Sequence, residues 1–331
     1  MAAPQISVIM ATYNRSNILG YSIASLRRST FTDWELIVVG DGCTDDSAAV
    51  VASFGDGRIR FVNRAANYGE QSGPNNDGFA MARGRYIAYL NHDDLYFSDH
   101  LATSLQVLQA SGADLVFAAT AAPAQRKAAE LGAAASRFSI LGVSPTGLYE
   151  PYIFAPASAW LLDRRLIEAI GPWRAAVDCV IESSQDFLFR AWKAHRRLVF
   201  KPLVTVLAVQ SGSRKNVYRN RETHENEYYA GQLRDNANFR EEILSHAAMA
   251  LAGQAALPKV HFNLTRGLRK LIYRPALRFG LHPRATKALL KGHGRGWMIG
   301  NLRRLRGLDA LTTRNAADPK GTAVYDATND S

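Results

Sequence analysis

The sequence of 331 residues predicts an α/β fold in which a mostly parallel sheet is covered on both faces by helices. Short apolar runs, rich in branched and aromatic residues, alternate with segments of helical spacing as far as about residue 120. Several of these apolar runs end in glycine and short polar residues, as strands do where they lead into loops. Strands that alternate with helices in this way form βαβ units, whose strands are parallel.

The elements follow one another closely along the first third of the chain. The predicted strands are Ile6–Tyr13, Trp34–Gly42, 59–64, 86–90 and 113–120. Helical spacing or capping residues predict helices within 15–30, 44–54, 73–84 and 99–111. Beyond them, an alanine-rich segment (121–138) is compatible with a mobile loop or a helix. A strand and a helix ending at Gly-Pro follow within 158–173, and a capped helix that leads into a strand follows within 183–200.

The composition is that of a globular chain, with 47% hydrophobic and 21% charged residues. The sequence has no apolar run of about 18 residues, so no transmembrane helix is predicted. The N-terminal residues lack the basic region of a signal peptide. Cys43 and Cys179 have neither metal-ligand spacing nor a disulfide pattern, which favours a reducing, cytoplasmic setting.

The charge is concentrated near the C-terminus. Residues 1–256 contain 25 Lys and Arg and 25 Asp and Glu, whereas residues 257–331 contain 15 and 4 and so carry the whole net charge of +11. A basic segment of this kind predicts an anionic partner, such as lipid headgroups, nucleic acid or a charged polymer.

Three predicted strands end in polar residues, at Thr12–Asn14, Asp41–Gly42 and Asn91–Asp94. Ligands bind at the carboxyl ends of parallel strands, so these loops are expected to meet at one crevice. Two adjacent carboxylates, Asp93 and Asp94, suit a divalent cation, because Mg²⁺ and Mn²⁺ prefer oxygen ligands. The alternative is that both residues only cap the next helix.

Four motifs occur in the order and at the separations of a known family: "ISVIMATYNR", "VVGDGCTDDS", "NYGEQSGPNNDG" and "GRYIAYLNHDD". Together with Gln185-Asp186, they make residues 5–210 resemble the family 2 glycosyltransferases of the GT-A fold. The resemblance implies inverting transfer of a sugar from a nucleotide-diphosphate sugar, assisted by Mg²⁺ or Mn²⁺. It also implies an acceptor that is a glycan or lipid-linked glycan of the cell envelope.

The resemblance assigns the sugar-donor site residue by residue. It implies that Ala11, Thr12 and Tyr13 border the nucleobase, and that Asp41 contacts the base or ribose. Gly40 stands where the family has another Asp, a departure that would loosen recognition of the sugar donor. The remaining matches are Asn76 of the Asn-x-Gly element, Asn91 in place of the first Asp of the metal motif, and Asp93 as the metal ligand. His92 is expected to point away from the metal, because side chains alternate along a strand.

The catalytic base implied by the resemblance is Asp186, at the start of a helix whose dipole keeps the carboxylate ionised. Gln185 replaces the family's Glu, and Glu182 is the next candidate for the base. Trp160 and Trp173 suit either the wall of an acceptor site or the core. Arg214 and Lys215 suit either a loop that reaches the diphosphate or the surface.

The chain is expected to divide into a catalytic domain at 1–234, a basic helical extension at 235–308 and a disordered tail at 309–331. Within the catalytic domain, 1–118 is the nucleotide-sugar half and 119–234 the acceptor half. Leu264, Leu268, Leu271 and Ile272 recur at helical spacing among basic residues within 257–308. This pattern predicts a helix on an anionic membrane surface, with packing on the catalytic domain as the alternative. The protein would then be cytoplasmic and peripheral at the inner face of the membrane.

Two other functions remain open at this stage. Loss of carboxylates at Gly40, Asn91 and Gln185 is compatible with a catalytically inactive protein that binds nucleotide sugars. A nucleotidyltransferase is disfavoured, because the loop after the first strand lacks the glycines and basic residues that grip a triphosphate. No nucleic-acid partner is expected, because the basic segment contains no recognisable DNA-binding module.

Overall fold

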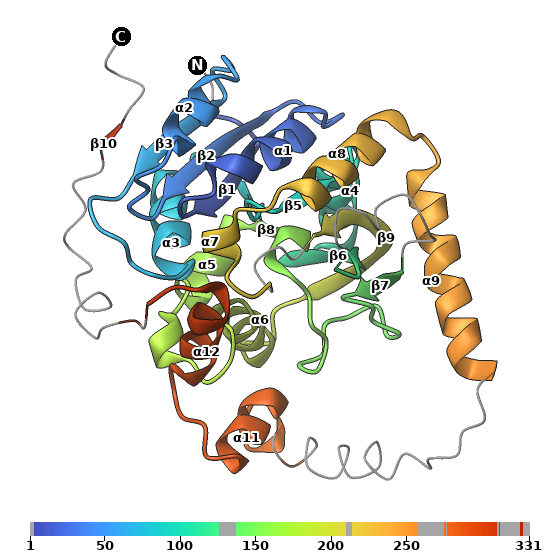
Figure 1. Ribbon diagram of the computed structural model, residues 1–331. Coiled ribbons are helices and arrows are strands. Elements are labelled where there is room, and N and C mark those ends of the chain that lie inside the picture. Colours follow the sequence, from blue (N-terminus) through green and yellow to red (C-terminus); the bar gives the residue numbers. More distant parts are fainter. Residues whose placement is uncertain are drawn as a thin grey trace.

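The computed structural model describes residues 3–125, 137–209, 214–256 and 277–309, together with 275, 311 and 325–326. The strands are β1 (Ile6–Thr12), β2 (Trp34–Gly40), β3 (Ile59–Asn63), β4 (Tyr86–Tyr89), β5 (Asp94–Tyr96), β6 (Leu115–Pro123), β7 (Phe138–Leu141), β8 (Trp160–Asp163), β9 (Leu198–Ala208) and β10 (Tyr325–Asp326). They form one sheet in the order β10-β3-β2-β1-β4-β8-β6-β9-β5, and β7 pairs with β6. Helices lie around this sheet, which confirms the predicted α/β fold (Figure 1).

The sheet is parallel through the first half of the chain. β1 lies between β2 and β4, with Ile6 opposite Trp34 on one side and Tyr86 on the other. β3 continues this parallel arrangement beyond β2. Every residue of β2 and β4 is buried, which accounts for their continuous apolar runs, since a strand covered on both faces has no solvent side.

The second half of the sheet is mixed. β8 is antiparallel to both β4 and β6, whereas β6 and β9 are parallel. Two short strands, β5 and β7, pair in antiparallel fashion with β9 and β6. Neither short strand was expected from the sequence, because three or four residues hold too little of an alternating pattern to identify a strand.

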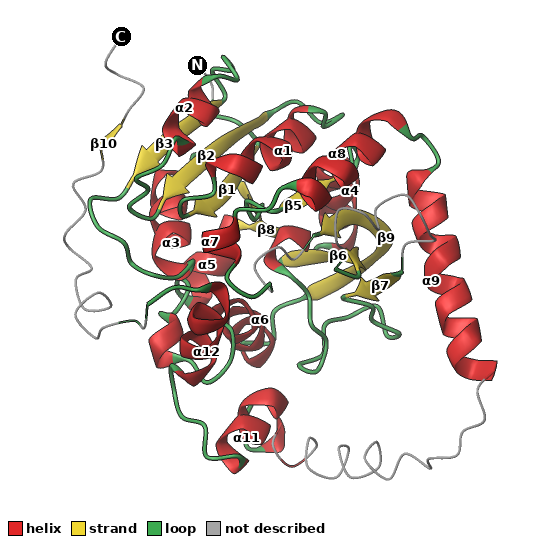
Figure 2. Ribbon diagram, viewed as in Figure 1, coloured by secondary structure: helices red, strands yellow, loops and turns green. Residues whose placement is uncertain are grey.

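Helices lie between most successive strands as far as β9, and the remaining helices follow β9 (Figure 2). They are α1 (Ser16–Arg27), α2 (Ser47–Ala52), α3 (Ser72–Met81), α4 (His100–Ser111), α5 (Arg164–Ile170), α6 (Ser183–Lys193), α7 (Val217–Asn220), α8 (His224–Asp235), α9 (Phe239–Ala256), α11 (Pro283–Leu290) and α12 (Trp297–Arg306), with 3₁₀ turns η2 (Ala157–Ala159) and η3 (Ala176–Asp178). α3 packs on β1 and β2, and Gly78 allows this close approach. A Cβ atom on Gly78 would lie 2.4 Å from Cγ2 of Ile9.

An aromatic cluster joins the two halves of the sheet. The rings of Trp160, Trp173 and Phe187 are stacked on one another, with centroids 5.7–5.8 Å apart. The indole nitrogen of Trp173 donates a hydrogen bond of 2.9 Å to the hydroxyl of Tyr89. Trp160 and Trp173 are 0% and 3% exposed, so both belong to the core and not to an acceptor-facing wall.

The C-terminal part of the chain is helical where the structure describes it. The predicted apolar stripe from Leu264 to Ile272 lies outside the described residues, as do residues 126–136 of the alanine-rich segment and most of the expected tail at 309–331. In that tail, Tyr325–Asp326 pairs with β3. No helix within the described ranges is both long enough and apolar enough to cross a membrane.

Candidate functional site

A cavity of about 400 Å³ opens at the carboxyl ends of β1, β2 and β4. The three predicted loops meet there, because parallel neighbouring strands end at the same edge of the sheet. From these loops the lining includes Ala11, Thr12, Tyr13, Asp41, Asn91, His92, Asp93 and Asp94. The walls also include Glu70, Glu182, Tyr218 and one face of α12.

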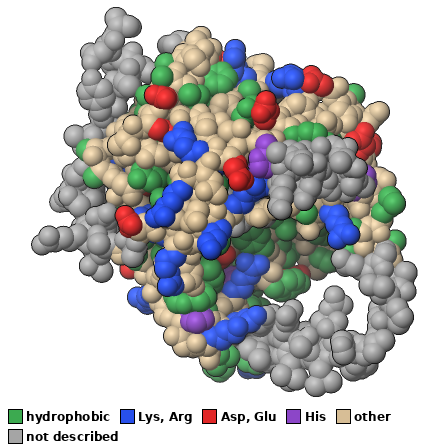
Figure 3. Space-filling view, in the orientation of Figure 1, with side chains coloured by type: hydrophobic (Ala, Val, Ile, Leu, Met, Phe, Trp, Pro, Cys, Tyr) green, Lys and Arg blue, Asp and Glu red, His purple; other side chains and the backbone are tan. Residues whose placement is uncertain are grey.

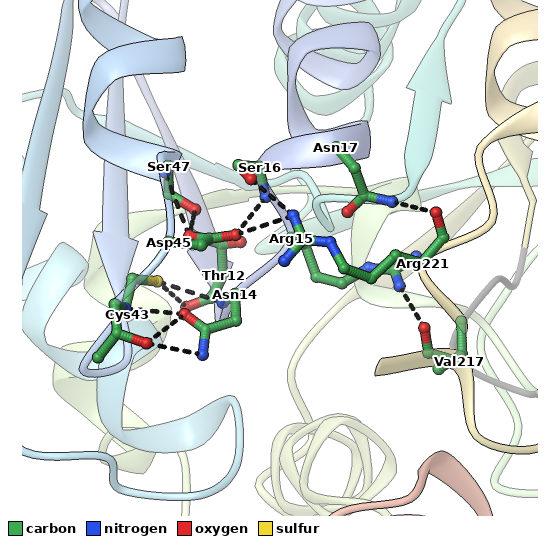
Figure 4. Close-up of polar contacts among 11 residues, drawn as sticks. Thr12, Asn14, Arg15, Ser16, Asn17, Cys43, Asp45, Ser47, Val217 and Arg221 are labelled. Carbon is green, nitrogen blue, oxygen red and sulfur yellow. Dashed lines mark hydrogen bonds and ion pairs between the residues drawn. The ribbon is translucent and has the colours of Figure 1, made fainter. Parts of the chain in front are cut away.

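The loop after β1 is fixed by polar contacts to α7 (Figure 4). Arg15 donates to the backbone oxygen of Val217 at 3.0 Å, and Asn17 donates to that of Arg221 at 3.0 Å. This docking brings the ring of Tyr218 within 5.9 Å of Tyr13 in the cavity wall. Thr12 is 2% exposed, and its hydroxyl has no hydrogen-bond partner among the described residues. A buried hydroxyl of this kind in a cavity wall is a ready contact for a polar ligand.

Asp41 shapes the loop at 67–69. Its carboxylate accepts hydrogen bonds from the backbone nitrogens of Tyr68 (2.7 Å) and Gly69 (2.8 Å). The side-chain nitrogen of Asn67 donates to it as well, at 3.1 Å. Burial raises the pKa of Asp41 to about 6, against the opposing effect of these hydrogen bonds and of nearby arginines. Asp41 therefore combines a position in the cavity wall with a structural role in the neighbouring loop.

Gly40, where the family resemblance expected Asp, has no room for a side chain. A Cβ atom there would lie 2.5 Å from Oδ1 of Asn63 and 2.8 Å from Cζ of Phe61. The Asn63 amide fills this space and exchanges two hydrogen bonds of 2.8 Å with the backbone of Cys43. Asn63 thus occupies the space beside Gly40, and its two hydrogen bonds to Cys43 hold the loop after β2.

The turn after β4 differs from one of the two interpretations of the adjacent carboxylates. The interpretation of Asp93 and Asp94 as helix caps is wrong, since Asp94 lies in β5 and α4 begins only at His100. His92 lines the cavity, and the expectation that it points away from the metal stays a prediction. β4 ends at Tyr89, so the alternation of side chains along a strand no longer applies at His92.

The neighbours of Asp93 fix the geometry of this turn. Asp94 accepts hydrogen bonds from the Ser158 hydroxyl at 2.6 Å and the Asn91 amide at 2.9 Å. Burial and the adjacent Asp93 raise the pKa of Asp94 to about 8. Nδ1 of His92 lies 3.1 Å from the backbone oxygen of Ala11, and burial lowers the pKa of His92. Asp94 therefore lines the cavity with its carboxylate held by two hydrogen bonds from the protein.

The donor set at this turn is compatible with a divalent cation. Asp93 is 9% exposed and lines the cavity beside the amide of Asn91. Mg²⁺ is commonly held by one or two carboxylates together with substrate phosphates, so Asp93 alone can serve with a bound diphosphate. Among the residues that the structure describes, no cluster of three or more His, Cys, Asp or Glu side chains has metal-binding geometry. The protein itself thus supplies few ligands.

The start of α6 contributes a different acid from the one predicted. Glu182 lines the cavity, and its buried Oε2 has no hydrogen-bond partner within the described part of the chain. Asp186 is absent from the described lining and forms ion pairs with Arg190 at 2.9 Å and Arg174 at 3.6 Å. The assignment of Asp186 as base stays a prediction, and Glu182 is the carboxylate that faces the cavity.

Two other residues that were predicted to bind the sugar donor, Asn76 and Arg214, are absent from the cavity lining that the structure describes. The amide of Asn76 exchanges two hydrogen bonds of 2.9 Å with the backbone of Trp173, which joins α3 to the loop before η3. Arg214 forms ion pairs with Glu222 and Glu225. The proposed roles of Asn76 and Arg214 in binding the sugar donor stay predictions.

Sequence reasoning missed the wall formed by α12. Met298, Ile299, Leu302, Arg303 and Arg306 of this helix line the cavity. Arg303 donates hydrogen bonds to the backbone oxygens of Gly69 and Asp309. The alternation of apolar and basic residues within 297–306 was visible in the sequence, but it indicated only an amphipathic helix and not the surface that the helix covers.

The fold is an α/β fold of the kind found in solved glycosyltransferases. The mannosyltransferase PcManGT of Pyrobaculum calidifontis, in complex with GDP-Man and Mn²⁺, is similar with a TM-score of 0.52 and 17% identity over 88% of each chain. S. aureus TarS 1-349, in complex with UDP-GlcNAc, is similar with a TM-score of 0.52 and 14% identity over 87% of this chain and 92% of that one. At these identities the likeness concerns the fold, and it confirms the GT-A architecture.

Residues 7–129 match the family described as glycosyl transferase family 2, and the rest of the chain lies outside this match. An Escherichia coli relative, the UDP-Glc:alpha-D-GlcNAc-diphosphoundecaprenol beta-1,3-glucosyltransferase WfgD, is 31% identical over 31% of this chain and 40% of its own length. A Campylobacter jejuni relative, the GalNAc(5)-diNAcBac-PP-undecaprenol beta-1,3-glucosyltransferase, is 38% identical over 31% of this chain and 34% of its own length. The chain therefore spans about two fifths or less of these curated relatives.

Proposed function

We propose that the protein is an inverting glycosyltransferase that moves a sugar from a nucleotide-diphosphate sugar to a glycan or lipid-linked acceptor. The observation that carries this proposal is the cavity at the strand ends, because the segment that matches the family supplies Thr12, Tyr13, Asp41 and Asp93 to its walls. Two relatives are named as glucosyltransferases acting on diphosphoundecaprenol-linked sugars, which supports a lipid-linked acceptor.

In this proposal the sugar donor lies between the loops after β1, β2 and β4. Ala11, Thr12, Tyr13 and Asp41 border the base and ribose, as the family resemblance implies. Asp93, with Asn91 beside it, holds Mg²⁺ or Mn²⁺ through the phosphates of the bound sugar donor. A cation held there neutralises the charge that develops on the leaving diphosphate.

An inverting transfer needs a base on the acceptor side of the anomeric carbon. The carboxylate of Glu182 is favoured for this role because it lines the same cavity as Asp93 and has no hydrogen-bond partner among the described residues at Oε2. Asp186, implied by the resemblance, is the alternative. Its carboxylate is engaged in ion pairs with two arginines, Arg174 and Arg190.

The test is hydrolysis and transfer from a panel of UDP- and GDP-sugars, with Mn²⁺ or with EDTA. The wild type should act on at least one sugar donor, and Asp93→Ala should abolish activity while the fold is retained. Asp235→Ala, at an exposed position outside the cavity lining, is the matched control. Nucleotide-sugar binding without turnover would indicate the inactive binding protein, and turnover of nucleoside triphosphates would indicate a nucleotidyltransferase.

We also propose that the protein is cytoplasmic and meets its acceptor at an anionic membrane surface. The proposal is supported by Phe279, Leu289 and Leu290, which are 79%, 49% and 72% exposed beside the basic residues of α11. Lys and Arg side chains are also numerous on the face drawn in Figure 3. Exposed apolar residues among basic ones suit the boundary between headgroups and acyl chains.

This proposal is tested by co-sedimentation with anionic and neutral vesicles. Phe279→Ser combined with Leu290→Ser should reduce binding to anionic vesicles, whereas Met249→Ser, at an equally exposed position of α9, should not. Unchanged binding by the double variant would contradict the proposal. Point substitutions are preferable to removal of 257–331, because that truncation also removes the cavity wall formed by α12.

A further inference from the structure

The cavity wall contains a buried hydroxyl group that the protein leaves without a partner. Ser183, the first residue of α6, is 3% exposed and lines the cavity. Its Oγ atom has no hydrogen-bond partner among the residues that the structure describes, and the same holds for Oε2 of the adjacent Glu182. Burying such oxygens without partners costs free energy. Two of them on adjacent residues of a cavity wall therefore indicate a polar ligand at this place.

Hydrogen bonds connect the start of α6 to the turn after β4. The side-chain amide of Gln185 donates to the backbone oxygen of Ala155 at 3.1 Å. A few residues further along the same segment, the Ser158 hydroxyl donates to Asp94 at 2.6 Å and accepts from the backbone nitrogen of Asn91 at 3.1 Å. The start of α6 therefore lies beside the turn after β4, separated from it only by this short segment.

The other walls near Glu182 and Ser183 are apolar. The start of α12 is fixed close by, since the backbone nitrogen of Gly296 donates to the backbone oxygen of Cys179 at 3.0 Å. The apolar residues that these neighbouring segments contribute to the cavity lining include Phe154, Pro156, Ile181, Met298, Ile299 and Leu302. A polar edge beside apolar walls suits a sugar ring, which carries hydroxyls on its rim and carbon-bound hydrogens on its faces.

We propose that Ser183 binds the acceptor, by a hydrogen bond to the sugar hydroxyl next to the one that attacks. The inference rests on the proposed function and adds a substrate class to it, a pyranoside with two neighbouring free hydroxyls. The attacking hydroxyl lies at Glu182 and its neighbour at Ser183, because two adjacent residues with unpartnered oxygens match an adjacent pair of hydroxyls. An apolar face of the ring packs against Met298 and Leu302.

The two residues have different roles in the transfer. The oxygen of the attacking hydroxyl forms a bond to the anomeric carbon of the sugar donor while the bond from this carbon to the diphosphate oxygen breaks. The hydroxyl proton passes to the carboxylate of Glu182, and the nucleoside diphosphate leaves with the bonding electron pair. Ser183 takes no part in making or breaking these bonds. It determines specificity, because it fixes which hydroxyl of the acceptor faces the anomeric carbon.

Ser47 supplies a matched control. Like Ser183, it is a buried serine at the first residue of a helix, but its hydroxyl donates to Asp45 at 2.6 Å. It is also absent from the cavity lining that the structure describes. Ser47→Ala therefore measures the general effect of removing a buried hydroxyl at a helix start.

The experiment measures transfer to methyl pyranosides from the UDP- or GDP-sugar on which the wild type acts. The panel contains the methyl glycosides of glucose, galactose, mannose and N-acetylglucosamine, with citronellyl phosphate as an isoprenoid probe. Ser183→Ala should raise the KM for the best glycoside by about fivefold to a hundredfold, as expected when a buried hydrogen bond is lost. The KM for the sugar donor should not change in this variant, and Ser47→Ala should behave as the wild type. Thermal unfolding checks that both variants are folded.

Monodeoxy analogues of the best glycoside separate a direct contact from a structural role. Among the analogues that keep the attacking hydroxyl, one should lose a similar factor with the wild type, because it lacks the hydroxyl that Ser183 binds. Ser183→Ala should lose little more with this analogue, because the contact is already absent. Every other analogue should change the two proteins by the same factor.

An unchanged KM for the glycoside in Ser183→Ala would overturn the assignment, as would a wild type that uses every remaining deoxy analogue as well as the parent glycoside. Equal losses in Ser183→Ala and Ser47→Ala, or losses that multiply independently for every analogue, would overturn it in favour of a structural role.

The choice of probe decides the acceptor class. Transfer to citronellyl phosphate but to no glycoside would overturn the inference, as would transfer to none of the probes by a wild type that hydrolyses its sugar donor. These results leave the proposed function intact. A wild type that acts on no sugar donor would instead overturn the proposed function, and this inference with it.

Discussion

Arg303 donates a hydrogen bond to the backbone oxygen of Gly69, which precedes it by 234 residues. This contact connects α12 to the loop that Asp41 holds through its own carboxylate. A second connection lies nearby, where the backbone nitrogen of Asn216 donates to the oxygen of Leu305 at 2.8 Å. Three distant segments of the chain thus meet around one cavity, and the segment that matches the family forms only part of it.

Substitution of the two acids at α6 should identify the base. Glu182→Gln should lower turnover by about 10²–10⁴-fold, the usual contribution of a general base, while binding of the sugar donor is retained. Asp186→Asn should mainly reduce stability, by about 1–3 kcal/mol, because it leaves Arg190 without its carboxylate partner. Steady-state kinetics and urea unfolding of both variants measure these effects. The opposite pattern, with turnover lost only in Asp186→Asn, would restore Asp186 as the base.

Two glycine-to-alanine substitutions should have effects of opposite sign. Gly78→Ala should destabilise the protein by about 1–3 kcal/mol, because the new methyl group overlaps Ile9 across the contact between α3 and β1. Gly231→Ala, inside α8 with no atom within 4 Å of the new Cβ, should stabilise it by about 0.5–1 kcal/mol. Denaturant unfolding gives both values. A Gly78→Ala protein as stable as the wild type would contradict the tight packing described here.

Substitution at Gly40 should reveal its coupling to Asn63. Gly40→Asp restores the family pattern, but it should cost about 1–3 kcal/mol, because the side chain meets Asn63 and Phe61. Combining it with Asn63→Ala removes one of these obstacles, so the double variant should be more stable than the sum of the single effects predicts, by about 1 kcal/mol. A double-mutant cycle in urea measures this coupling, and strict additivity would argue against it.

Lys201 should make stability depend on pH. It is 2% exposed, and burial lowers its pKa to about 7 from 10.5. The unfolded chain therefore binds more protons than the folded one between these values. The free energy of unfolding should rise with pH across that window, by at most about 1.4 kcal/mol per pH unit, and this contribution should be lost as the pH falls towards 7.

Lys201→Met should remove this dependence, whereas Lys287→Met, at an exposed position of α11, should preserve it. The measurement is urea unfolding of the wild type and both variants at several pH values from 7 to 10. The neutral amine can still donate to the hydroxyls of Thr103 at 2.8 Å and Ser104 at 2.9 Å, so the packing should persist across the range. Parallel pH curves for Lys201→Met and the wild type would contradict the prediction.

The sequence was informative where the structure depends on local pattern. Continuous apolar runs identified β1, β2 and β4, because buried parallel strands have no polar face. The topological rule for strand ends then brought Asp41 and Asp93 to one cavity. The sequence also showed that Asp94 is one of two adjacent carboxylates after a buried strand. It did not identify Ser158 as the hydrogen-bond partner of Asp94, because 64 residues separate the two.

The remaining features depend on contacts between segments far apart in the chain. The orientation of His92 follows from where β4 ends, and Asn63 fills the space beside Gly40 only once β2 and β3 have paired. The surface that α12 covers is set by two hydrogen bonds to other segments. Arg303 donates to the backbone oxygen of Gly69, and the backbone nitrogen of Asn216 donates to that of Leu305. No periodicity within residues 297–306 contains this information.

The long separation between Gly69 and Arg303 has a consequence for biosynthesis. At the usual rate of about 5–20 residues per second, the ribosome makes Arg303 roughly 10 to 50 seconds after Gly69. The parallel strands and their loops can pair during this interval, but the cavity lacks one wall until α12 emerges. A nascent chain can thus be folded at its strand-end loops and still be unable to enclose a ligand.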